Sequence, residues 1–246
     1  MERGVREAEL VAGLFERHGV PVGSRVVELG CGIGRVGVPL AARGYWVSCL
    51  DISPRFVERA REYAGLVGVS GRFEAVVGDA WEASRLLGRE RYDAVLFFWT
   101  TLLGYRGSVE SDLALLGEAA RLARVGGRLF ILRQAHRDLL VCRRSLCGFS
   151  PVFKGGEDYG IVVVEDAFFD PIGSVLENTW TYYRRSGDDL VFAGRAGFRI
   201  RIYSVTELVD LAGRVGWRLE GVYGSLRGDP FDPARTGLNI VFRRES

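Results

Sequence analysis

The sequence has 246 residues, of which 48% are hydrophobic, and this length predicts one α/β domain with an added element. Its formal net charge is only +2 although 26% of the residues are charged, and the two signs are interspersed, which argues against nucleic acid as a partner. The charged N-terminal segment has no continuous apolar core, so we expect a cytoplasmic protein without a signal peptide, a membrane span or a membrane partner.

The first half of the chain predicts a regular alternation of helices and strands. The spacing of its apolar residues predicts a first helix over residues 5–18. Ser53 followed by Pro54 predicts an N-cap and the first turn of a later helix. The expected strands are 25–29, 45–52, 72–80, 91–99 and 128–135, and the expected helices between them are 35–44, 53–68 and 109–127.

This alternation defines the expected sheet. Strands separated by helices imply parallel pairing with right-handed crossovers. The apolar run over 94–99 is typical of a strand that is buried on both faces. A double glycine, Gly126 and Gly127, is expected to end the helix over 109–127.

The alternation stops after about residue 148. Three stretches look like strands with no helix between them, and turn-forming residues separate them: 160–170, 174–185 and 189–204. Ser204 and Glu207 then match the capping box of a helix over 204–216, and strands are expected at 217–224 and 238–244. The predicted organisation is an α/β domain of residues 1–148 and 204–246, with an inserted antiparallel lid of residues 149–203.

Residues 26–37, VVELGCGIGRVG, hold two overlapping glycine patterns. Gly32, Gly34 and Gly37 match G-x-G-x-x-G, which indicates NAD or FAD. Gly30, Gly32 and Gly34 match G-x-G-x-G, which indicates S-adenosylmethionine (SAM). Either pattern describes a turn from strand to helix that lets a ligand approach the backbone, so the glycines alone do not decide between them.

Glu28 distinguishes the two ligands. It lies near the end of the strand that Gly30 closes, where a buried carboxylate is costly without partners. A pyrophosphate gains nothing from a negative charge there, whereas a ligand with a sulfonium and an ammonium group does. Glu28 therefore favours SAM, directly or through water, although the same carboxylate also suits the simpler role of fixing the glycine loop by hydrogen bonds.

Two further acids end neighbouring strands. Asp51 ends the second strand, where a carboxylate accepts hydrogen bonds from both ribose hydroxyls. Asp79 ends the third strand and is placed to accept from an adenine amine, while the amide of Ala80 serves a ring nitrogen. The simpler alternatives are a capping role for Asp51 and a turn-forming role for Asp79 after Gly78.

With these residues, the chain resembles the class I SAM-dependent methyltransferases. The matching stretches are VVELGCGIG, CLDIS, VVGDA, YDAVLFFW and GGRLFI, in the family's order over about residues 24–135. The resemblance implies a Rossmann-like, seven-stranded, mostly parallel sheet with the last strand antiparallel. It also implies SAM as the cofactor and S-adenosylhomocysteine as the product. It carries cofactor contacts onto Glu28, Gly30, Gly32, Asp51, Ile52, Asp79, Ala80 and Phe97, to which we add Cys31, Gly34 and Trp99.

The meander is similar to that of small-molecule methyltransferases of the glycine and sugar N-methyltransferase kind, where such strands roof the active site. The tetrapeptide that marks methylation of base amino groups is absent from the stretch FFWTTLLGY, after the fourth strand. We therefore expect in-line transfer of a methyl group to an N or O atom of a small-molecule acceptor. A nicotinamide oxidoreductase and a non-catalytic SAM-binding protein remain alternatives, and a homodimer is compatible with each.

The candidate acceptor residues follow the fourth and fifth strands or lie on the meander. His136 is preferred as a base over His18, which we expect to be solvated, and Arg133 is placed to bind a carboxylate bidentately. The other candidates are Trp99, Tyr105, Trp180, Tyr182, Arg201 and Tyr203, each with the simpler interpretation of a core or solvated side chain. The catalytic residue is left unassigned among His136, Arg133 and Tyr105.

The cysteines give no reason to expect a metal. Their spacing matches no metal site, and reduced, buried thiols are the simplest interpretation: Cys31, Cys49, Cys142 and Cys147. A Cys142–Cys147 disulfide is expected only if the source is a hyperthermophile.

Overall fold

A seven-stranded sheet forms the body of the protein in a computed structural model that describes residues 2–99, 102–141, 152–156 and 161–245. The strand order is β10-β11-β5-β4-β1-β2-β3, and β11 alone runs antiparallel to its neighbours. The bounds are β1 (Arg25–Leu29), β2 (Trp46–Asp51), β3 (Phe73–Val77), β4 (Tyr92–Phe98), β5 (Ala123–Gln134), β10 (Trp217–Tyr223) and β11 (Leu238–Arg244). The predicted Rossmann-like sheet with an antiparallel last strand is confirmed.

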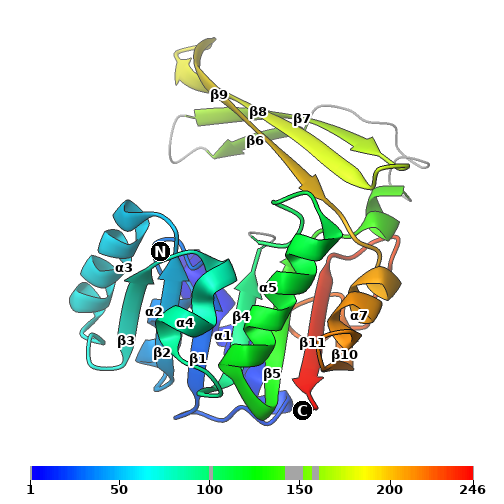
Figure 1. The fold of residues 1–246 in the computed structure, drawn as a ribbon. Helices are drawn as coiled ribbons and strands as arrows, with labels where there is room; N and C mark the ends of the chain where they lie inside the picture. Colours follow the sequence, from blue (N-terminus) through cyan, green and yellow to red (C-terminus); the bar gives the residue numbers. More distant parts are fainter. Residues whose placement is uncertain (1, 100–101, 142–151, 157–160, 246) are drawn as a thin grey trace.

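Helices cover both faces of this sheet (Figure 1). One face packs against α1 (Glu2–Arg17), α2 (Gly37–Ala42) and α3 (Pro54–Val67). The other packs against the 3-10 turn η1 (Ala80–Glu82) and the helices α4 (Ala83–Leu87), α5 (Val109–Leu122) and α7 (Val205–Gly213). No helix among the residues described is long and apolar enough to cross a membrane.

The helix caps predicted from the sequence are present. The Ser53 side chain accepts a hydrogen bond from the Phe56 amide at the start of α3. Ser204 and Glu207 form the complete capping box of α7.

The predicted end of the helix over 109–127 is wrong. Helix α5 stops at Leu122, and Ala123 already has extended backbone and pairs with Tyr92 of β4. The β4–β5 register shifts before Ala94, and a Cβ on Gly127 would lie 2.8 Å from the Arg124 carbonyl oxygen. The double glycine therefore permits an irregularity inside a long strand instead of ending a helix.

A second, antiparallel sheet lies above the carboxyl edge of the first (Figure 1). It has four strands in sequential order: β6 (Val152–Gly156), β7 (Ile161–Asp170), β8 (Val175–Ser186) and β9 (Asp189–Arg201). The sequence predicted the last three and missed β6, a short strand that contains two glycines. Helix α4 was also missed because five residues are too few to show a helical period.

The second sheet is docked on the body by a small core and by the loop after β4. Three of its buried residues and Ile202, which follows β9, pack against Ala135 and Leu140: Phe169, Leu176 and Ile200. The Arg201 amide donates to the Gly104 carbonyl at 3.1 Å, and a Cβ on Gly104 would lie 2.0 Å from the Arg201 carbonyl oxygen. This close approach ties the end of β9 to the segment that follows β4.

Candidate functional site

The glycine loop joins β1 to α2 at the carboxyl edge of the sheet. Gly30, Gly32 and Gly34 all have positive φ angles, of 71°, 57° and 73°, a region that favours glycine. The Asp51 carboxylate at the end of β2 accepts from the Gly32 amide at 2.8 Å and from the Ser53 amide at 2.9 Å. The acid thus braces the loop, and a carboxylate has further acceptor sites for ribose hydroxyls.

Glu28 lies beneath this loop and is 4% exposed. Its carboxylate accepts a hydrogen bond from the Gly37 amide, and Oε2 is 4.0 Å from the Cys49 sulfur. Burial raises the pKa of this carboxyl to about 8, against the lowering effects of the Gly37 amide and the Arg35 charge, while Asp51 raises it further. The loop-fixing role considered from the sequence is present, and the raised pKa leaves this carboxyl mostly protonated near neutral pH in the ligand-free protein.

Asp79 caps the 3-10 turn after β3, where its carboxylate accepts from the Trp81 amide at 3.0 Å. The Arg106 guanidinium donates to the other carboxylate oxygen at 2.5 Å and lies 3.9 Å from the centre of the Trp81 ring. Ala80 is buried beside it. An adenine amine would have to share the Asp79 carboxylate with Arg106, a residue that no sequence pattern had singled out.

The other predicted cofactor residues differ in exposure. Phe97 and Cys31 are buried, and Cys31 is a free thiol, as is Cys49. Ile52 is 72% exposed and Trp99 is 47% exposed, both at strand ends on the carboxyl edge. Exposed apolar side chains at this edge suit the flat faces of a base. Cys142 and Cys147 lie outside the described residues.

A charged cluster at the first turns of α1 was not predicted. The buried Glu7 carboxylate pairs with Arg35 of the glycine loop and with Arg3 at 3.2 Å. The guanidinium of Arg3 lies 4.8 Å from the centre of the Trp99 ring, and that of Arg35 lies 5.1 Å from it. The i,i+4 spacing of Arg3 and Glu7 is visible in the sequence, but its contact with Trp99 depends on how α1 crosses the sheet.

Arg133 ends β5 beside this cluster. Its guanidinium lies 3.5 Å from Glu7 Oε1, and its backbone has a φ of +55°. Tyr105, on the loop after β4, stacks on Phe198 of β9 with ring centres 6.4 Å apart. These two candidates therefore contact different elements, α1 and β9.

Both histidines are buried, which contradicts the solvated position expected for His18. His136 is fully buried, with Nε2 2.8 Å from the Thr236 carbonyl oxygen and Nδ1 accepting from the Leu139 amide at 3.3 Å. Since both ring nitrogens are engaged, His136 is a structural residue and we do not retain it as a base. His18 was expected to be solvated and is 7% exposed, in contact with Glu220 and Tyr223.

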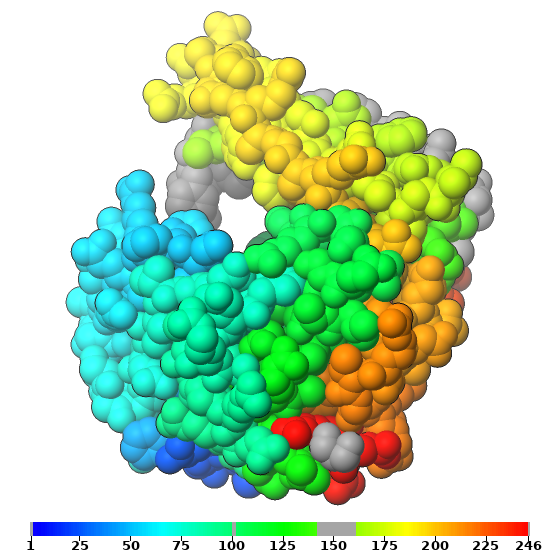
Figure 2. Space-filling view, viewed as in Figure 1, coloured from blue at the N-terminus to red at the C-terminus, as the bar shows by residue number. Residues whose placement is uncertain are grey.

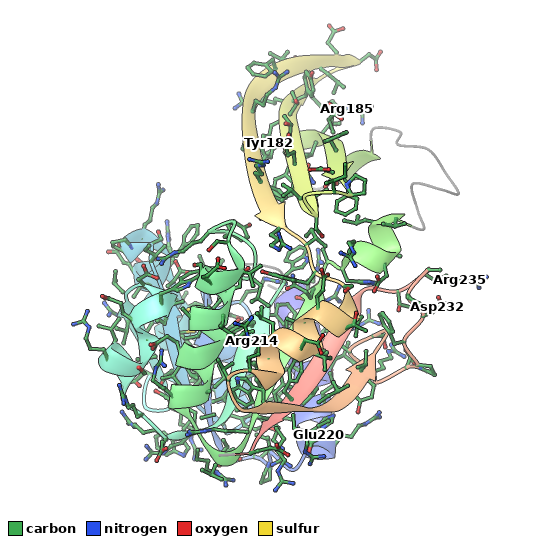
Figure 3. The ribbon with its side chains drawn as sticks, turned by 45° about the vertical axis from the view of Figure 1, so that its right-hand side comes forward. Tyr182, Arg185, Arg214, Glu220, Asp232 and Arg235 are labelled. Atoms are coloured by element: carbon green, nitrogen blue, oxygen red, sulfur yellow. The ribbon has the colours of Figure 1, made fainter. Side chains whose placement is uncertain are left out.

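The inner face of the second sheet lies over the carboxyl edge. Leu176 packs on the body, so Asn178, Trp180 and Tyr182, which alternate with it along β8, share the inward face. Trp180 contacts Phe198, with ring centres 5.3 Å apart. Figure 3 shows Tyr182 and Arg185 on this sheet above the body, whereas Glu220 lies low on β10. Figure 2 shows a hollow between the tip of β8–β9 (yellow) and the region of α3 (cyan).

Two polar atoms on the inward face have no hydrogen-bond partner among the described residues. They are the Trp180 indole nitrogen and the Asn178 Oδ1, while Asn178 Nδ2 donates to Glu165 at 2.5 Å. Arg201 and Tyr203, the other predicted meander residues, serve to dock the sheet. The Tyr203 hydroxyl donates to the buried Asp112 carboxylate at 2.5 Å, and the Arg201 guanidinium lies 5.4 Å from the centre of the Tyr203 ring.

The comparisons with known proteins agree with this architecture. Residues 26–127 match the family model described as a methyltransferase domain. The chain is similar to the CcbJ methyltransferase from Streptomyces caelestis, with 22% identity, a TM-score of 0.78, and coverage of 96% of this chain and 89% of that one. It is also similar to CalS10, an amino pentose methyltransferase from Micromonospora echinaspora, with 20% identity and a TM-score of 0.71. That match covers 98% of this chain and 91% of CalS10. At these identities the likeness shows the fold.

The curated sequence relatives match less than half of the chain. A SAM-dependent Diels-Alderase, iccD, from Talaromyces variabilis is 30% identical over 118 residues, which are 48% of this chain and 39% of that protein. The chain spans 12 to 40% of the length of the curated relatives it matches. The predicted resemblance to class I SAM-dependent methyltransferases is confirmed, and SAM is the cofactor that the matches support.

Proposed function

We propose, from the methyltransferase domain at residues 26–127, that this protein transfers the methyl group of SAM to an N or O atom of a small-molecule acceptor. The observation that carries the proposal is the set of three acids, Glu28, Asp51 and Asp79, around the glycine loop at the carboxyl edge. The family match favours it over a nicotinamide oxidoreductase. The hollow beneath the second sheet favours it over a protein that only binds SAM (Figure 2).

The residues at the edge fit the cofactor. A Cβ on Gly32 would meet no atom within 4 Å, so the loop is open to a ligand beside the Asp51 carboxylate. Asp51 and Asp79 would hold the ribose and the adenine, and the exposed Ile52 would lie against the base. Glu28 would face the positive methionine end, where a cation favours the charged form of its carboxyl.

Catalysis in this proposal is alignment and exclusion of water. SAM supplies an activated methyl group, so an unprotonated amine needs no base from the protein, whereas a hydroxyl or a protonated amine must pass its proton to a side chain or to water. The acceptor atom needs to lie roughly 3 to 3.5 Å from the methyl carbon in line with the bond that breaks. The inward face of the second sheet, with Trp180, Tyr182 and Phe198, would close over the acceptor as a lid and keep water out.

The polar atoms of the lid that lack partners among the described residues support this role. A buried donor or acceptor without a partner costs about 1–3 kcal/mol, so the Trp180 indole N–H and Asn178 Oδ1 are placed where a polar acceptor molecule would satisfy them. Tyr105 borders the same proposed pocket, because its ring stacks on that of Phe198. The acceptor pocket is thus proposed between the loop after β4 and strands β8 and β9.

The test is calorimetry with SAM, S-adenosylhomocysteine and NAD on the wild type, Asp51→Ala and Asp210→Ala. Asp210 is an exposed acid on α7 and serves as the matched control. Loss of charged hydrogen bonds, at about 1.5 to 3 kcal/mol each, should weaken SAM about tenfold or more in Asp51→Ala. Binding of NAD without SAM would overturn the proposal, as would unchanged SAM affinity in a folded Asp51→Ala protein.

A further inference from the structure

A second recess opens at the carboxyl edge of the sheet. It is a cleft of about 390 Å³ between the first turns of α1, the end of β5 and the loop after β10. Four arginines and two acids line it, with Leu10, Ser225 and Leu226: Arg3, Arg6, Arg133, Arg227, Glu7 and Asp229. We call it the arginine cleft. Its lining charge is positive, although the chain as a whole is nearly neutral.

One buried carboxylate contacts two guanidiniums that line this cleft and a third, that of Arg35, which lies outside it. The Glu7 side chain is 4% exposed and contacts Arg3, Arg35 and Arg133. The lining holds four guanidiniums and two carboxylates, so positive charge is in excess in the cleft. This excess favours the binding of an anion in the cleft.

The position of Arg133 is held by its surroundings. Phe98 pairs with Leu132, so the next residues, Trp99 and Arg133, lie side by side, and both have positive φ, of 67° and 55°. Such backbone is strained in a non-glycine residue and persists only where neighbours enforce it. The buried Asn239 side chain does so here, because its Oδ1 accepts from the Arg133 amide at 3.0 Å.

We propose that the arginine cleft binds an oxyanion of the methyl acceptor, a carboxylate or a phosphate ester, with Arg133 as its central contact. The planar guanidinium presents paired donors that match both groups. Arg133 lies next to Trp99, which is at the start of the loop after β4 that borders the proposed acceptor pocket. The acceptor class is therefore an anionic small molecule whose N or O atom reaches under the lid. This inference rests on the proposed function for the identity of the reaction.

The test uses inorganic phosphate and acetate as probes, on protein saturated with S-adenosylhomocysteine at low salt. Thermal unfolding at increasing probe concentration gives an apparent dissociation constant for each. Arg133→Gln should weaken both probes about tenfold or more because a charged, bidentate contact is lost. Glu7→Gln should tighten them, since it removes the competing carboxylate. Arg218→Gln, at the far end of β10 and paired with Glu245, is the control and should leave them unchanged.

The outcomes separate this inference from the proposed function. Equal probe affinity in the wild type and Arg133→Gln overturns the inference, and so does a probe that binds only when S-adenosylhomocysteine is absent, because the cleft would then hold the cofactor's own carboxylate. A preference for phosphate or for acetate supports it and selects between the two acceptor groups. Absence of SAM binding in parallel calorimetry would refute the proposed function while leaving the anion site intact.

Discussion

Replacing Glu28 with Gln should change how the stability of the ligand-free protein depends on pH. Burial raises the pKa of the Glu28 carboxyl from 4.5 to about 8 in the folded state. Between these two values the folded protein holds a proton that the unfolded chain has released. Stability must therefore fall as the pH rises from 4.5 toward 8, the reverse of the usual behaviour of a paired carboxylate.

The size of the effect follows from the same raised pKa. Over the range in which only the folded state holds this proton, stability changes by about 1.36 kcal/mol for each pH unit. A rise from pH 6 to pH 8 should therefore remove about 2 kcal/mol of stability through the ionisation of Glu28. Gln resembles the protonated acid and still accepts from the Gly37 amide, but it does not titrate. Glu28→Gln should thus gain about 2 kcal/mol relative to the wild type over this range.

The assay is urea unfolding of both proteins at several pH values between 5 and 8.5. Other groups titrate equally in the two proteins, so the difference between their free energies of unfolding isolates Glu28. SAM binding should oppose this loss of wild-type stability at high pH, because the positive methionine end of SAM favours the ionised carboxyl of Glu28. The affinity of the wild type for SAM should therefore rise with pH. A difference that stays constant from pH 6 to pH 8 would refute the buried, raised-pKa environment assigned to Glu28.

Two further predictions concern the second sheet. Gly104→Ala should lower the free energy of unfolding by more than about 2 kcal/mol, because its Cβ would overlap the Arg201 carbonyl. The control is Gly107→Ala, also at positive φ but with nothing within 4 Å, which should lower it by about 1 kcal/mol. Equal melting temperatures of the two variants would contradict the close approach of Gly104 and Arg201. Replacing residues 150–200 with a glycine-serine bridge keeps the Tyr203–Asp112 hydrogen bond. This deletion should abolish methyl transfer, whereas calorimetry should still detect SAM binding. Turnover at the wild-type rate would rule out the lid.

Much of the fold could be predicted because it depends on local patterns. The strand β1, the caps at Ser53 and Ser204 and the final strand were predicted at or near their observed bounds, since buried strands and capping residues are set by neighbours in sequence. The double glycine misled because its role depends on the register between β4 and β5. Likewise, His18 looked solvated at a helix end until Glu220 and Tyr223, two hundred residues away, enclosed it.

In the candidate site, too, the residues set by local patterns could be predicted and those brought together by the tertiary fold could not. Glu28, Asp51 and Asp79 follow strands of the parallel sheet, so chain order alone brings them to one edge. The partners of the arginine cleft come from α1, β5 and the loop after β10, which no periodicity connects. A shared cofactor keeps the first group recognisable, whereas the acceptor is contacted by segments whose meeting depends on the tertiary fold. Acceptor specificity should therefore be sought in Arg133, the lid and the first turns of α1, and not in the glycine loop.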